Sequence, residues 1–193
     1  MPGRVGTPCP PNAWYRNDGG QRAAHPTHGH YFMSAVLARR WIGLILVVIA
    51  LDQITKLYFH TNFRPGERLN VLPFFDWILT YNTGAAFSFL ADAGGWQRWF
   101  FVALALVVSA WCWRWLNREV DPRVQLALAL IIGGAIGNVI DRIWLGKVID
   151  FILVYWAPWN YYYPAFNVAD GAISIGAVLM LWSAFVSSKS VKQ

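Results

Sequence analysis

Four aspartates lie in or beside long apolar segments of this 193-residue chain: Asp52, Asp141, Asp150 and Asp170. A charge at the centre of a membrane helix costs roughly 2.5–3.5 kcal/mol on insertion scales, so each of them needs an explanation. Two aspartates held about 3 Å apart cannot both ionise and therefore share one proton. The ionised partner can accept a proton from water while the other donates one, which is sufficient chemistry to hydrolyse a peptide bond.

Each carboxylate also has a structural explanation. Asp52 is followed by Lys56 at i+4, so an ion pair on one helix face would account for it. Asp141 could cap a helix end or hold the arginine that follows it, and Asp170 lies where a helix N-terminus favours negative charge. Asp150, in the segment VIDFIL, has no adjacent base and is the hardest to explain as scaffold.

The composition predicts that these residues are positioned by membrane helices. Hydrophobic residues make up 56% of the chain and charged residues 13%, with a mean hydropathy of +0.36, whereas a soluble domain has about 25% charged residues. The net charge of +6 does not indicate a nucleic-acid partner, because the basic residues flank apolar runs and form no basic stripe. A span needs about 20 apolar residues, which predicts four transmembrane helices near 37–59, 97–116, 124–145 and 167–186.

The distribution of Lys and Arg predicts the orientation of these spans. Basic residues precede the first span, crowd the link between the second and third, and follow the fourth, so both termini should be cytoplasmic. Segments 60–96 and 146–166 then face outward, and their aromatic and β-branched stretches 74–82 and 147–156 predict strands. We therefore expect an all-α membrane protein with a small β-rich extracytoplasmic shelf. The four aspartates converge on this side, whereas Asp76, in the outer loop, should be solvated.

Residues 1–32 differ from the rest of the chain. They hold five Gly, five Pro and three of the four His, with no sustained apolar period, and are predicted to be a disordered leader. Met33 is an alternative start, so the leader is expected to be dispensable or not native, and residues 33–193 should form one domain. No metal or other cofactor is expected, because Cys9 and Cys112 have no partners at metal-ligand spacing.

Five motifs of this chain occur in the order and rough spacing of the bacterial lipoprotein signal peptidase (signal peptidase II) family. They are DQITK (52–56), YNTGAAFS (81–88), GNVIDR (137–142), VIDF (148–151) and FNVAD (166–170). The chain resembles this family over about 37–186. The resemblance implies an aspartic endopeptidase of the bacterial inner membrane, with its active site near the outer face. Such enzymes remove the signal peptide from diacylglyceryl-modified prolipoproteins by cutting just before the lipidated cysteine.

The resemblance assigns the catalytic dyad to Asp150 and Asp170. Positions around the family's substrate groove match polar or small residues here, namely Asn82, Gly84, Asn138, Arg142 and Asn167. Three further matching residues could stabilise the site or contact the substrate: Asp52, Lys56 and Asp141. One departure is Gly171, where the family pattern leads us to expect serine.

Other classes of membrane protein also carry intramembrane carboxylates. A small proton- or ion-coupled transporter is the main alternative, but the sequence has no visible repeat and its carboxylates gather at one face instead of the midplane. A non-catalytic scaffold would leave Asp150 unexplained. The partners expected for the peptidase are lipidated prolipoproteins and membrane lipid, with the protein acting as a monomer.

Overall fold

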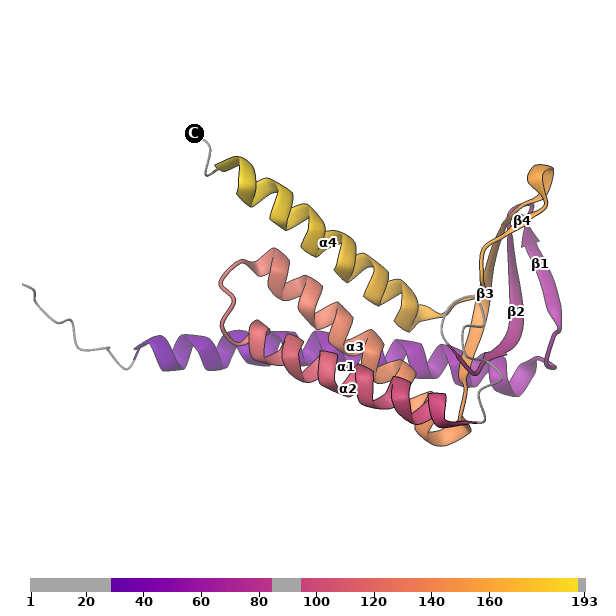
Figure 1. Ribbon diagram of the computed structural model, residues 1–193, viewed down its shortest axis with the longest axis horizontal. Helices are drawn as coiled ribbons and strands as arrows, with labels where there is room; N and C mark the ends of the chain where they lie inside the picture. Colours follow the sequence, from indigo (N-terminus) through magenta and orange to yellow (C-terminus); the bar gives the residue numbers. More distant parts are fainter. Residues whose placement is uncertain (1–28, 85–94, 191–193) are drawn as a thin grey trace, which may run out of the picture.

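The computed structural model describes residues 29–84 and 95–190. Four long helices form a bundle, and a small sheet lies at one end of it, running across the direction of the helices (Figure 1). The predicted fold class is confirmed. Residues 1–28 of the expected leader lie outside the described residues, as do 85–88 of the motif YNTGAAFS, whereas residues 29–32 are helical.

The helices are α1 (Gly29–Asn62), α2 (Trp96–Leu116), α3 (Pro122–Leu145) and α4 (Val168–Ser190). The apolar segments of the helices agree with the predicted spans to within three residues at each end, although α1 itself begins eight residues before the predicted start. The segments long and apolar enough to cross a membrane are Arg40–Asn62, Trp96–Leu116, Pro122–Leu145 and Val168–Val186. The last residues of α1 and α3 and the first residues of α2 and α4 lie at the same end of the bundle. The sheet-forming segments that connect these helices therefore also lie at that end (Figure 1).

Helix α3 is the centre of the bundle. In its most apolar window 67% of the residues are buried, against 22–28% for the other three helices. Small residues permit this packing: a Cβ at Gly133 would lie 2.9 Å from Val48 of α1, and one at Gly137 would lie 2.5 Å from the Asp52 carboxylate. A Cβ at Gly134 would meet the backbone of α4. The G-x-x-x-G spacing of Gly133 and Gly137 thus serves close helix packing.

The sheet is antiparallel, with strand order β1-β2-β3-β4. Its strands are β1 (Arg68–Leu72), β2 (Phe75–Asn82), β3 (Val148–Trp156) and β4 (Tyr161–Tyr162), and the short 3-10 helix η2 (Ala157–Trp159) joins the last two. The two predicted strands, 74–82 and 147–156, are therefore confirmed as β2 and β3. Phe59 of α1 stacks on Phe151 of β3 with ring centroids 4.4 Å apart, which fixes the sheet on the bundle.

The prediction that Asp76 is solvated was wrong. Its side chain is buried, forms an ion pair with Arg68, and accepts a hydrogen bond of 2.7 Å from Asn70. Arg68 also lies over the ring of Tyr155, with its guanidinium carbon 4.9 Å from the centroid. The segment before β2 forms β1, which pairs along the edge of β2 and supplies the partners that a buried carboxylate requires.

Candidate active site

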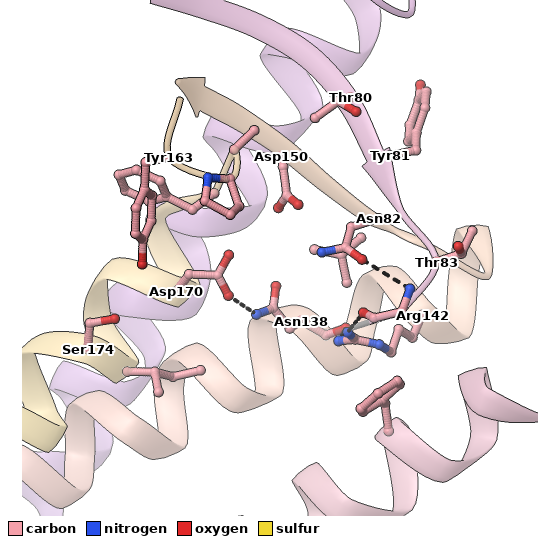
Figure 2. Close-up of a pocket in the computed structure, with 17 residues that line it drawn as sticks. Thr80, Tyr81, Asn82, Thr83, Asn138, Arg142, Asp150, Tyr163, Asp170 and Ser174 are labelled. Atoms are coloured by element: carbon pink, nitrogen blue, oxygen red, sulfur yellow. Dashed lines mark hydrogen bonds between the residues drawn. The ribbon is translucent and has the colours of Figure 1, made fainter. Parts of the chain in front are cut away.

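Asp150 and Asp170 face the same pocket from two different elements. Asp150 lies within β3, paired in register with Thr80 of β2, and Asp170 lies in the first turn of α4. Figure 2 shows both side chains reaching into a space between the sheet and the ends of α3 and α4. The pocket has a volume of about 650 Å³. The two carboxylates therefore face one pocket from a strand and from a helix, 20 residues apart in the sequence.

Most of the predicted groove residues also line this pocket. Those that do are Asn82, Gly84, Asn138 and Arg142, in addition to the two aspartates. Asn167 does not line it but lies directly behind it, and its side chain is fully buried. The three predicted supporting residues, Asp52, Lys56 and Asp141, are buried outside the pocket lining.

The first turn of α4 holds Asp170 through a reciprocal cap. The Asn167 side chain accepts a hydrogen bond of 2.9 Å from the Asp170 backbone N–H, and the Asp170 carboxylate accepts one of 3.3 Å from the Asn167 backbone N–H. This is a capping box with Asn at the cap and Asp three residues later. One carboxylate oxygen of Asp170 is thereby committed to the start of the helix.

Asn167 also reaches the other aspartate. Its side-chain amide donates to Asp150 at 2.7 Å and to the backbone carbonyl of Ile149 at 3.2 Å. Asn138 of α3 donates to the second oxygen of Asp170 at 2.8 Å (Figure 2). Two asparagines, one from α3 and one from the cap of α4, thus fix the orientation of both carboxylates.

The surroundings of Asp150 favour the protonated form of its carboxyl up to about neutral pH. Burial, followed by the charge of Asp170, raises the pKa of the Asp150 carboxyl from 3.8 to about 7. Hydrogen bonds from Asn167 and Asn82 oppose this rise but do not cancel it. A carboxyl with this pKa can hold or release a proton near neutral pH, as acid–base chemistry requires.

Arg142 lies at the side of the pocket nearest the end of β2. Its two terminal guanidinium nitrogens donate to the carbonyls of Asn138, at 3.3 Å, and Gly84, at 3.2 Å. The guanidinium carbon lies 5.2 Å from the centroid of the Phe101 ring of α2. Within the described residues, no ion pair joins Arg142 to either pocket aspartate. Arg142 thus links α3 to the end of β2 while adding a positive charge to the pocket.

The other two aspartates share one buried lysine. Lys56 forms ion pairs with Asp52 at 2.8 Å and with Asp141 at 2.9 Å, and all three side chains are at most 2% exposed. The predicted Asp52–Lys56 pair is therefore present. Asp141 pairs with this lysine, and not with the adjacent arginine as one of our alternatives had it, because the arginine lies on the pocket side.

This triad also holds the backbone around the pocket. Asp52 accepts a hydrogen bond of 2.9 Å from the N–H of Ala169 in the first turn of α4, and Asp141 accepts one of 3.1 Å from the N–H of Ile149 in β3. Each backbone donor belongs to the residue immediately before a pocket aspartate. The triad therefore positions β3 and α4 from outside the pocket lining, and Lys56 also donates at 2.9 Å to Asn138, which lines the pocket.

Sequence reasoning missed several residues of the site. Gln53 donates to both triad carboxylates, at 3.1 Å to Asp52 and 3.0 Å to Asp141, and its place beside Asp52 was the available signal. Apolar members of the pocket wall, such as Phe101 and Ile173, are indistinguishable in the sequence from lipid-facing residues. Among the residues that the structure describes, no group of three or more His, Cys, Asp or Glu could hold a metal ion.

A bundle of four spans with a carboxylate-lined pocket at one end is the arrangement expected of a membrane-embedded aspartic peptidase, and known proteins place the chain in this class. The model of the signal peptidase II family matches residues 44–186. The chain belongs to this family. It is a peptidase with several spans in the bacterial inner membrane, and the transporter alternative is not favoured.

Individual relatives agree with this assignment. The chain is 53% identical to the lipoprotein signal peptidase of Pseudomonas putida over 153 residues, which cover 78% of this chain and 89% of the relative. It is 48% identical to that of Pseudomonas aeruginosa over the same length. A bacterial membrane enzyme solved by the in meso method at 2.3 Å resolution superposes with a TM-score of 0.69 at 29% identity, covering 80% of this chain and 92% of the solved one.

Proposed function

We propose that the protein removes the signal peptide from diacylglyceryl-modified prolipoproteins by cutting before the lipidated cysteine, with Asp150 and Asp170 activating the attacking water. The observation that carries this proposal is the pairing of two carboxylates from different elements across one pocket. Neither carboxylate takes part in an ion pair within the described residues. The pKa of Asp150, raised to about 7, supports a state in which the pair holds a single proton near neutral pH.

The reaction needs no other nucleophile. The ionised aspartate takes a proton from water as the water oxygen attacks the scissile carbonyl, and the protonated aspartate donates its proton to the carbonyl oxygen. When the tetrahedral intermediate collapses, the C–N bond breaks and a proton passes to the leaving amine. We assign acid and base roles to the pair and not to its members, because two coupled carboxyls titrate as a unit.

The remaining pocket residues are proposed to hold the substrate. The end of β2, at Asn82 and Gly84, offers backbone and amide groups to an extended peptide, and Asn138 keeps the Asp170 carboxylate oriented towards it. Arg142 provides a fixed positive charge for a substrate carbonyl. The apolar wall formed by Phe101 and Ile173 continues towards the membrane span and suits the lipid on the cysteine.

The orientation of the protein follows from the same proposal. The sheet end of the bundle would lie at the outer face of the membrane, where exported prolipoproteins are available, and both termini would be cytoplasmic. The basic residues near the opposite ends of the spans support this topology, as sequence analysis predicted. We further propose that the enzyme acts as a monomer, and that a chain beginning at Met33 retains full activity.

The decisive test is cleavage of a lipidated prolipoprotein by the purified protein in detergent, with Asp150→Asn and Asp170→Asn alongside. Each variant should lose activity by about 10²–10⁴-fold or more, because each removes the shared proton. Helical content should stay close to wild type, because an asparagine at 150 can still accept from Asn167 and an asparagine at 170 keeps one of the two hydrogen bonds that Asp170 accepts. Glu67→Gln, which alters an exposed acid of the sheet loop, is the matched control and should remain active.

Substantial activity in either aspartate variant would refute the dyad. A second arm adds EDTA to the wild-type enzyme. We expect turnover to be unaffected, and a loss that is restored by a divalent metal would contradict the proposed chemistry.

A further inference from the structure

Ser174 lines the pocket from α4, one helical turn after Asp170 (Figure 2). At a spacing of four residues the two side chains lie on the same face of the helix, with Ser174 about 6 Å further along the span. The neighbouring residue on the same helix, Ile173, also lines the pocket and is apolar. Ser174 thus places a single hydroxyl at the membrane side of the carboxylates.

This hydroxyl has no hydrogen-bond partner within residues 29–84 and 95–190. In membrane helices Ser and Thr hydroxyls commonly donate to the carbonyl four residues earlier. Thr55 and Thr61 of α1 both do so, at 2.7 and 2.9 Å. Ser174 has the same carbonyl available, at Asp170, and does not use it. Its donor is therefore free for a group that enters the pocket.

We propose that Ser174 is a specificity-determining residue whose hydroxyl donates a hydrogen bond to an ester carbonyl of the diacylglyceryl group on the substrate cysteine. The inference rests on the proposed function. In such a substrate the ester groups lie a few bonds beyond the cysteine sulfur, on the membrane side of the scissile bond. A peptide bond held at Asp170 therefore brings an ester to the depth of Ser174, and an ester carbonyl is purely an acceptor.

The surrounding wall agrees with this assignment. Beyond the ester groups the substrate consists of hydrocarbon, and the side chain of Ile173, next to Ser174 on α4, offers only apolar contacts. Polar groups line the pocket near the end of β2, where Asn82 and Arg142 can serve the polar backbone of the peptide. Ser174 is the hydroxyl at the boundary between the two environments, which is where the substrate changes from polar to apolar.

The test compares two synthetic substrates that share one peptide and differ only in the lipid on cysteine. One carries the diacylglyceryl group, with ester carbonyls, and the other carries a dialkylglyceryl group, in which ethers replace the esters. The wild-type enzyme should favour the ester substrate in kcat/KM by roughly 3- to 10-fold, the range of one neutral hydrogen bond. Ser174→Ala should lose this preference while keeping the wild-type value for the ether substrate, and Ser174→Thr should restore it.

Thr61→Ala removes an exposed hydroxyl of α1 outside the pocket and should leave the ester preference unchanged. Equal losses by Ser174→Ala on both substrates would overturn the inference, because they would indicate contact with the peptide or a structural role. Equal turnover of both substrates by the wild type would also overturn it. Neither result touches the dyad, since Asp150→Asn should abolish cleavage of both substrates whatever Ser174 does.

Discussion

The bundle contains two pairs of aspartates in opposite electrostatic settings. Asp52 and Asp141 share a buried lysine and lie outside the pocket lining, whereas Asp150 and Asp170 face the pocket and have no lysine or arginine in ion-pair contact among the described residues. Asn138 connects the two pairs, because it accepts from Lys56 at 2.9 Å and donates to Asp170 at 2.8 Å. The two settings are therefore only one side chain apart.

The difference shows how one membrane protein can tie some buried carboxylates to a cation and leave others facing a pocket. Asp52 and Asp141 are in direct contact with Lys56 and serve as acceptors for backbone N–H groups of β3 and α4. The pocket aspartates are held by neutral amides instead, and amides orient a carboxylate without fixing its charge. Contact with a single cation thus distinguishes the two pairs.

The largest effect on stability is expected from Lys56→Met. Removing the shared cation leaves two buried carboxylates without a partner, which should lower the free energy of unfolding by about 3–5 kcal/mol. Thermal unfolding in detergent measures this loss. Lys147→Met is the matched control: Lys147 lies over the Tyr81 ring at 3.7 Å, a contact worth only about 0.5–1 kcal/mol at a partly exposed site. Equal melting temperatures for the two variants would remove the contrast between the pairs.

The pocket pair should instead be destabilising when ionised, and Asp150→Asn tests this. The pKa of Asp150 is 3.8 in the unfolded chain and about 7 in the folded one, so the wild type loses stability as pH rises from about 4 to 7 and no further above 7. The stability of Asp150→Asn relative to wild type should accordingly improve by about 2–3 kcal/mol between pH 5 and pH 7. A stability difference that does not change with pH would show that this carboxyl titrates normally.

Arg142→Lys tests whether the positive charge of the pocket acts through its geometry. Two guanidinium nitrogens bond carbonyls of α3 and of Gly84, and a lysine ammonium cannot reproduce this fork. We expect kcat/KM to fall roughly 10-fold, the loss of one or two hydrogen bonds, with the melting temperature nearly unchanged. Turnover equal to wild type would mean that charge alone is sufficient there.

The smallest expected effect is at Gly171, beside the pocket aspartate of α4. A Cβ at this position meets no atom within 4 Å, so Gly171→Ala should stabilise the helix by about 0.5–1 kcal/mol. Gly134→Ala is the opposite case, because its Cβ would meet the backbone carbonyl of Ala169 and should force α3 and α4 apart. A destabilised Gly171→Ala protein would indicate that the start of α4 needs the flexibility of glycine.

The sequence predicted the framework better than the connections within it. Four spans and two strands followed from hydrophobic length and from β-branched and aromatic composition, which are local properties. The Asp52–Lys56 pair followed from helical spacing. The ion pair of Asp141 with Lys56 instead of Arg142 could not be predicted. It depends on which side of α3 faces α1 and which side faces the pocket.

Two errors have different causes. The burial of Asp76 depends on the antiparallel pairing of β1 with β2. The local sequence of this short segment does not reveal that pairing. The capping box formed by Asn167 and Asp170 could have been predicted from the three-residue spacing of Asn and Asp in FNVAD. It was missed because we considered only the helix dipole there. Recognising it would have shown that Asp170 has a structural task in addition to any chemical one.

The two sets of hydrogen bonds made by Asn167 have a consequence for drug resistance. Asn167 holds Asp150 with its amide and the first turn of α4 with its carbonyl oxygen, so any replacement weakens both. A small molecule that binds through Asp150 and Asp170 would engage pocket carboxylates that Asn167 holds from behind, and a resistant bacterium could not replace Asn167 without weakening the start of a membrane helix. Escape mutations against such a compound should therefore arise among the apolar wall residues, where one side chain can replace another.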